Sequence, residues 1–185
     1  FQRPDEQAYF RNAGEVTRNG LEVLFEWEPI ERLKGRFAYT FQDFHYGSFV
    51  APEGNFTDKT EPGAPPHQVV LGATYEAPFG LFTAAQYRFV DAYPVNSANT
   101  IDNWSYRVVD VRVGLDRRWL GLRFRPFFSL DNILNQRYNS SAIVNSIGDR
   151  LVRADAAVTI NGLVRWTINR GYAGLEAWAG TPGTV

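Results

Sequence analysis

Apolar and polar residues alternate with a period of two near the start of the chain. Between Leu21 and Trp27 every odd position is apolar or aromatic, whereas Glu22 and Glu26 hold even positions. The stretch from Phe37 to Phe41 repeats the pattern, with aromatic residues at its odd positions. Successive side chains of a strand point to opposite faces of a sheet, so this period predicts β-strand. The expected sheet has one aromatic, apolar face and one polar, charged face.

The same alternation recurs along most of the chain and predicts seven strands. Their expected bounds are Val16–Trp27, Leu33–Phe44, His67–Glu76, Leu81–Val90, Tyr106–Leu115 and Gly121–Asn132, followed by a seventh that begins near Leu151. Pro126 lies inside the sixth of these segments. Because proline has no N–H to donate to the ladder, its presence indicates an edge or a bulge.

The connections between the expected strands are short and long in turn. The short ones are Glu28–Arg32, Ala77–Gly80 and Asp116–Trp119, and the long, polar ones are Gly47–Pro66, Asp91–Ser105 and Ile133–Arg150. Antiparallel strands reverse direction, so every short turn falls at one end of the sheet and every long loop at the other. Outer-membrane β-barrels have short periplasmic turns and long extracellular loops. The predicted fold is therefore all-β, an antiparallel transmembrane β-barrel segment.

The composition of the chain agrees with this fold and narrows its function. Aromatic residues make up 15% of the chain, which suits the aromatic girdles of a membrane barrel. The net charge of −1 argues against nucleic acid, which is bound by a basic stripe. The chain has no cysteine, which excludes disulfides and thiolate chemistry.

No apolar run approaches the roughly 20 residues that a transmembrane helix needs, but a transmembrane strand needs only about 10 alternating residues. The chain contains no methionine, and Phe1 opens in the middle of a polar stretch. We therefore expect a piece of a longer protein, one that does not function by itself.

Charged side chains of the expected strands gather at the positions of the polar face. We expect the following to face the lumen of a barrel: Glu22, Glu26, Arg36, Arg88, Asp110, Arg112, Arg123 and Arg125. A polar inner face suits a water-filled or plugged lumen. The last four of these residues are also candidates for a ladder of opposite charges across neighbouring strands. Two interpretations stay open, namely contacts to a plug or solute, and a polar wall whose charges satisfy one another.

Aromatic residues on the long loops are candidate ligand contacts, because binding residues are concentrated on loops. They are Phe49, Phe56, Tyr93, Trp104 and Tyr138. The alternative is an aromatic belt that anchors the strand ends at the lipid headgroups.

Candidate catalytic and metal-binding groups are few. Only His45 and His67 are histidines, and both lie where strands meet loops. The chain has no glycine-rich phosphate loop and no nucleophile elbow, and Ser140 and Ser141 lack an evident base. The sequence therefore predicts no enzyme activity, no catalytic or metal site and no cofactor.

Several stretches follow one another in a familiar order. They are Phe10–Gly14, Asn19–Glu22, Trp27–Pro29, Phe37–Thr40, Gly63–His67 and Ser129–Tyr138. The last of them resembles an Asn-Leu-Phe-(Asn/Asp)-x-x-Tyr signature. Together, across roughly residues 9 to 150, they resemble the C-terminal barrel region of TonB-dependent outer-membrane receptors of the siderophore type.

This resemblance implies a 22-stranded barrel with an N-terminal plug domain that couples to the TonB complex. The chain would supply about the last seven strands, without the plug, and an odd count would end its last strand in the periplasm. The whole protein would lie among the lipids of the outer membrane of a Gram-negative bacterium. It would bind and import a ferric siderophore or a similar scarce nutrient, energised through TonB.

Residues 151–185 depart from the pattern of that family. They lack its aromatic-Glu-Pro-x-x-Gly-Arg stretch, and Ala179–Val185 follows the strand-like segment Tyr172–Trp178. We expect an atypical C-terminal strand and tail in a partial barrel domain that covers residues 1–185.

Two other readings of the alternation remain open. One is a complete small outer-membrane barrel of about eight strands, with a structural role or as a narrow pore. The other is a soluble β-sandwich that serves as a binding module, because an alternating strand can equally bury one face against a second sheet.

Overall fold

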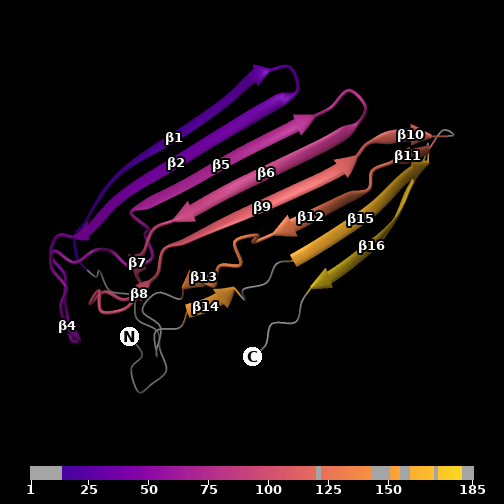
Figure 1. The fold of residues 1–185 in the computed structure, drawn as a ribbon. Coiled ribbons are helices and arrows are strands. Elements are labelled where there is room, and N and C mark those ends of the chain that lie inside the picture. The colour runs from indigo at the N-terminus through magenta and orange to yellow at the C-terminus, as the bar shows by residue number, and fades with distance from the viewer. Residues whose placement is uncertain (1–13, 120–121, 143–150, 155–158, 169–170, 181–185) are drawn as a thin grey trace.

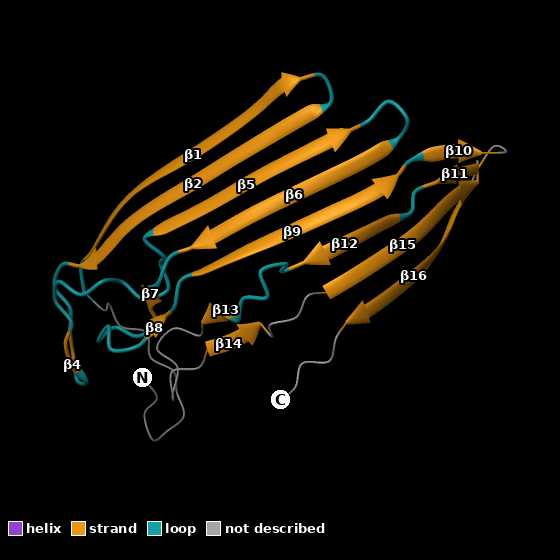
Figure 2. Cartoon of the chain, viewed as in Figure 1, coloured by secondary structure: helices purple, strands orange, loops and turns teal. Residues whose placement is uncertain are grey.

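The computed structural model describes residues 14–119, 122–142, 151–154, 159–168 and 171–180. These residues form strands, turns and loops (Figure 2), and they include no helix that is long and apolar enough to cross a membrane. The stretch Phe10–Ala13, which carries part of the family resemblance, lies outside them.

One antiparallel sheet of ten strands dominates the fold (Figure 1). Its long strands, in spatial order, are β1 (Val16–Ile30), β2 (Leu33–Tyr46), β5 (His67–Glu76), β6 (Leu81–Val90), β9 (Tyr106–Leu115), β12 (Phe127–Asp131), β15 (Thr159–Ile168) and β16 (Gly171–Gly180). The short strands β10 (Arg117–Trp119) and β11 (Leu122–Phe124) extend it beside β15. The predicted all-β antiparallel fold is confirmed.

The sheet is a single open layer in the described part of the chain. Among the described residues the other sheets are two-stranded hairpins, none of which spans the main sheet as the second layer of a β-sandwich would, and β1 pairs only with β2. The structure therefore shows neither the soluble sandwich nor a closed small barrel among these residues.

Five of the predicted strands agree with the structure, and the later ones differ. The sixth is interrupted at Arg125–Pro126, where it divides into β11 and β12. The Pro126 carbonyl there accepts a hydrogen bond from the Leu115 N–H at 2.9 Å. The predicted tight turn at Asp116–Trp119 is wrong, because Arg117–Trp119 is a strand, β10, that pairs with β11.

The predicted seventh strand is also wrong in its position. Leu151 begins β14 (Leu151–Ala154), which pairs with β13 (Tyr138–Ala142) in a separate two-stranded sheet. The seventh crossing of the main sheet is β15, and β16 adds an eighth. β16 runs back toward the end that carries the long loops (Figure 1), so the described residues cross the main sheet an even number of times and not the expected odd number.

The predicted sorting of loops is confirmed. Short hairpin connections lie at one end of the sheet, and three small hairpins lie near the other end (Figure 1). These hairpins are β3 (Val50–Ala51) with β4 (Gly54–Asn55), β7 (Tyr93–Pro94) with β8 (Asp102–Asn103), and β13 with β14.

The register places apolar and polar rows on opposite faces of the sheet. One row, which we call the outer face, runs through Phe25, Phe37, Leu71, Tyr87 and Val109. The neighbouring row on the opposite face, the charged face, runs through Glu26, Arg36, Gly72, Gln86 and Asp110. Many large apolar side chains of the outer face are exposed in this chain. Such an extended apolar surface requires apolar surroundings.

The buried apolar core lies at the long-loop end and not within the sheet as a whole. It consists of Val90, Tyr93, Val95, Tyr106 and Val108, with Ile101 and Tyr138 packed against it. Val90, Tyr106 and Val108 hold positions of the charged face. The loop between β6 and β9 therefore folds over that face and covers the part of it nearest the long loops.

Candidate functional site

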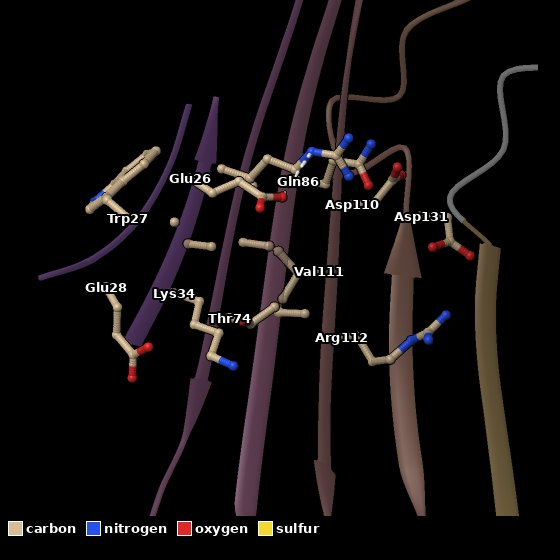
Figure 3. A pocket seen from close by; sticks show the side chains of 16 residues that line it. Glu26, Trp27, Glu28, Lys34, Thr74, Gln86, Asp110, Val111, Arg112 and Asp131 are labelled. Carbon is tan, nitrogen blue, oxygen red and sulfur yellow. Dashed lines mark ion pairs between the residues drawn. The ribbon is translucent and has the colours of Figure 1, made fainter. Parts of the chain in front are cut away.

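The charged face holds an open hollow of about 680 Å³ between β1 and β12 (Figure 3). Its floor includes Gly72 of β5 and Ala84 of β6, two small residues that the register places on this face. Glu26 and Lys34 lie to one side of this floor, and Asp110, Arg112 and Asp131 lie to the other. Small side chains at the centre and long charged ones at the sides give a wide, polar concavity.

The structure brings the predicted lumen-facing residues onto this one face. Seven of the eight hold strand positions of the charged face by register, and Arg125 lies in the break between β11 and β12. Glu26 and Arg36 face each other directly across β1 and β2. Their carboxylate oxygen and guanidinium Nε are 3.9 Å apart, and both side chains are exposed. That this face borders a lumen stays a prediction.

The expected charge ladder has a different acidic member. Asp110 accepts a hydrogen bond at 2.8 Å from the Asn132 N–H, so its carboxylate holds the end of β12. The Arg112 guanidinium lies 4.8 Å from the centre of the Phe127 ring. Asp116, which the sequence places in a turn, is the acidic partner of Arg123 and Arg125.

The Asp116 carboxylate lies beyond the end of β9, where the short connections gather. Arg123 donates to it through two nitrogens, with the Nε at 2.7 Å, and the Nε of Arg125 is 3.1 Å away. The hydrogen bonds from Arg123 lower the pKa of the Asp116 carboxyl below its ordinary value, and the positive charges of Arg123, Arg125 and Arg118 act in the same direction. Partial burial opposes this shift.

The lowered pKa of Asp116 makes its contribution to stability depend on pH. A carboxyl whose folded pKa lies below its unfolded pKa stabilises the fold above the unfolded value, and the contribution disappears as the pH falls through the folded pKa. We expect Asp116→Asn to cost up to about 1 kcal/mol at neutral pH, the usual scale of exposed ion pairs. Urea unfolding of the full-length protein at neutral and acidic pH measures this cost. A cost that persists below both pKa values would contradict the assignment.

Aromatic residues of the first long loop form a cluster with the end of β2. The ring centres of Tyr46 and Phe49 are 4.7 Å apart, and those of Phe49 and Phe56 are 5.3 Å apart. The two predicted ligand contacts in this loop therefore lie side by side and are half-buried.

The other three predicted ligand contacts differ in exposure. Tyr93 is buried, and its hydroxyl accepts a hydrogen bond from the Asn103 side chain at 2.8 Å. Tyr138 stacks on Tyr106 with ring centres 4.5 Å apart. Trp104 is 81% exposed. The ligand role of all five residues stays a prediction, and Trp104 is the one whose ring surface is openly available.

Side-chain amides connect the three long loops, which sequence reasoning missed. Asn99 joins the second loop to the first, because its amide accepts from the Thr60 N–H and donates to the Thr60 carbonyl, both at 2.9 Å. Asn103 joins the second loop to β13 through the Asn139 side chain, at 3.0 Å. The signal available in the sequence is the set of asparagines in these loops, but single residues do not reveal partners about 40 positions away.

The signature stretch Ser129–Tyr138 forms a tight turn at the end of β12. Asn132 and Asn135 adopt left-handed backbone conformations, with φ of 53° and 48°. The Asn132 side chain accepts from the Gln136 N–H and donates to the Gln136 carbonyl, both at 3.1 Å. These asparagines therefore form the turn that ends β12, a role for which asparagine is well suited because it tolerates left-handed conformations and bonds the nearby backbone.

The two histidines lie at the long-loop end of the outer face. The Nδ1 of His67 is 2.9 Å from the Tyr39 hydroxyl, and its ring stacks with Phe41. His45 pairs with Asp43. Within the described residues, histidine, cysteine, aspartate and glutamate form no group of three or more that would suit a metal ion.

Comparison with known proteins identifies related sequences. Residues 1–135 match the model of a family described as TonB dependent receptor-like, beta-barrel. The ferrioxamine receptor of Yersinia enterocolitica is 27% identical over 133 residues, which are 70% of this chain and 18% of that receptor.

Solved structures share the fold. The ferric preacinetobactin receptor of Acinetobacter baumannii superposes with a TM-score of 0.67 and 20% identity, over 86% of this chain and 24% of that one. A ferric citrate transporter in its unliganded form gives a TM-score of 0.65 and 15% identity, over 77% of this chain and 23% of the transporter. A siderophore receptor of Acinetobacter baumannii gives a TM-score of 0.63 and 18% identity, over 78% and 21%. The chain thus spans about a fifth to a quarter of the length of these relatives.

Proposed function

This chain belongs to the TonB-dependent receptor β-barrel family, and on that premise we propose that it forms part of the wall and outer loops of an uptake receptor. The receptor would lie in the outer membrane of a Gram-negative bacterium. Its outer face would meet lipid, and its charged face would meet water, a plug domain and a passing solute. The work of such a protein is binding and transport, and we propose no catalytic step.

The observation that carries this proposal is the two-faced, single-layered sheet with sorted loops. A membrane barrel needs an apolar outer surface and tolerates a polar interior. The register supplies both in adjacent rows, since Leu71 lies between Phe37 and Tyr87, whereas Gly72 lies between Arg36 and Gln86. In the described part of the chain no second layer spans either face, and the loop between β6 and β9 covers the charged face only at the long-loop end.

We propose a ferric siderophore, or a similar scarce nutrient, as the substrate. The sequence relative is named for ferrioxamine, and the structural relatives are named for ferric preacinetobactin, ferric citrate and siderophores. The solute would first meet the long loops, including the exposed ring of Trp104. Energy for its passage would come from the TonB complex acting on a plug domain outside this chain.

Uptake by whole cells tests this function. The full-length gene is expressed in a Gram-negative host that lacks its own siderophore receptors, and iron-55 uptake is measured with ferrioxamine, ferric citrate and ferric preacinetobactin. We expect uptake of at least one of these chelates, and its loss when an uncoupler collapses the proton-motive force. If the cells take up none of the three chelates and small solutes leak passively into them, the protein is a pore instead.

Substitution of Trp104 tests where the chelate first binds. Because this side chain is 81% exposed, we expect Trp104→Ala to change stability by less than about 0.5 kcal/mol. If the ring contacts the chelate, the variant raises the concentration needed for half-maximal uptake. Val50→Ala, which removes an exposed apolar side chain from another long loop, is the matched control, and an equal effect of both substitutions would remove Trp104 from the binding surface.

A further inference from the structure

Arg88 occupies an unusual position on the charged face. It lies on β6 opposite Val70 and Val108. The next pair on the same face, toward the long loops, is Val90 and Tyr106. Val108 is only 2% exposed, and Val90 and Tyr106 are buried as well, because the loop between β6 and β9 covers them. The Arg88 side chain therefore starts beside an apolar patch and has a buried Nε, and in such surroundings the dielectric is low and charge interactions are strong.

The side chain of Arg88 lacks the partners that other arginines of this face possess. Its Nε is buried and has no hydrogen-bond partner among the described residues. Arg36 has Glu26, Arg123 and Arg125 have Asp116, and Arg112 lies over a phenylalanine ring. None of the ion pairs found in the described parts of the chain includes Arg88.

A buried donor of a charged group is costly to leave unpaired, so such groups in folded proteins normally have a partner. A guanidinium offers donors in a planar fork, and a carboxylate accepts two of them at once. We propose that Arg88 is a binding site for a carboxylate that this chain does not supply. The site would lie on the inner wall, just beneath the loop that covers Val108.

Two sources would present the same chemistry to Arg88. One is an acidic side chain from the rest of the protein, since the chain spans about a fifth to a quarter of the length of its relatives. The other is a free carboxylate-bearing solute that enters the lumen. The proposal rests on the proposed function only in taking the charged face as the wall of a lumen.

Chemical modification of arginine distinguishes these sources. The full-length protein in lipid vesicles is treated with phenylglyoxal, which reacts with accessible guanidinium groups, and modification of Arg88 is followed by peptide mass spectrometry. Arg36 is the internal reference, because it lies on the same face, is exposed and is only weakly paired. Parallel samples contain sodium citrate, or sodium chloride at equal ionic strength. The experiment measures protection of Arg88 from modification and not transport. The carboxylate site can therefore be refuted even if the protein takes up a chelate.

Each source predicts its own result. With a carboxylate from the protein itself, Arg88 reacts about tenfold more slowly than Arg36 without added solute, and Arg88→Gln unfolds at a lower temperature than Arg88→Lys, which keeps the charge. With a solute carboxylate, Arg88 reacts readily alone, and citrate slows it about tenfold whereas chloride does not.

Two results would overturn the site. In the first, Arg88 reacts as fast as Arg36 in citrate and in chloride alike. In the second, Arg88 reacts slowly, but the Gln and Lys variants unfold at the same temperature, so that the side chain is merely covered and no carboxylate binds it.

Discussion

Replacing Leu71 with arginine is expected to destabilise the full-length protein in a lipid bilayer by about 2–4 kcal/mol, the cost of a cation on the lipid face of a barrel at mid-depth. Leu71 lies near the middle of β5, between Phe37 and Tyr87 on the outer face. It is 42% exposed in this chain, so a steric clash would not explain the cost. Urea titration of the folded protein in vesicles, followed by tryptophan fluorescence, measures it.

Gln86→Arg is the matched control for this experiment. Gln86 holds the neighbouring row of the charged face, where Gly72 and Asp110 lie on either side. An arginine there meets water and an opposite charge, so we expect a change of less than about 0.5 kcal/mol. Equal costs for the two substitutions would contradict the assignment of the faces.

Replacing Asn103 with alanine is expected to loosen the packed loops by about 2–4 kcal/mol, because two or more buried polar groups lose their partners. Asn103 is fully buried. Its amide donates to the Tyr93 hydroxyl at 2.8 Å and exchanges hydrogen bonds with Asn139. The substitution therefore leaves the Asn139 side chain without its acceptor and opens the contact between the second and third long loops.

Hydrogen exchange measures this loosening locally. The Val95 N–H donates to the Ile101 carbonyl at 2.9 Å within the same loop, and we expect its exchange to accelerate roughly 30-fold or more. Asn96→Ala is the control, because the Asn96 side chain bonds Thr100 in its own loop and its loss should cost only about 1 kcal/mol. Unchanged exchange at Val95 in Asn103→Ala would show that the loops are not held together by this residue.

The period of two predicts β1, β2, β5, β6 and β9 because each has a mainly apolar and a mainly polar side. Because successive side chains of a strand point to opposite faces, this regularity assigns each residue to one face of the sheet. The sequence after β9 predicts the bounds of the strands less well. Pro126 signals the interruption before β12, but the extension of the hairpin through Arg117–Trp119 is hidden because its charged residues resemble a turn.

The packing of the loops is not readable from the sequence in the same way. The contacts of Asn99 with Thr60 and of Asn103 with Asn139 join positions 39 and 36 residues apart. Their partners depend on how the whole sheet aligns the loops, not on local pattern. The predicted ligand contacts Tyr93 and Tyr138 illustrate the limit, because aromatic loop residues look alike in a sequence whether they pack inward or, like Trp104, lie exposed.

The chain contains no cysteine, so single cysteines at successive positions of β5 can carry a spin label in the full-length protein. Electron paramagnetic resonance then compares collisions of each label with oxygen, which concentrates in lipid, and with a water-soluble nickel chelate. If the outer face meets lipid, labels at Val69, Leu71 and Ala73 favour oxygen, and labels at Val70, Gly72 and Thr74 favour nickel. A series without this alternation, or with nickel reaching both faces equally, would contradict a membrane wall.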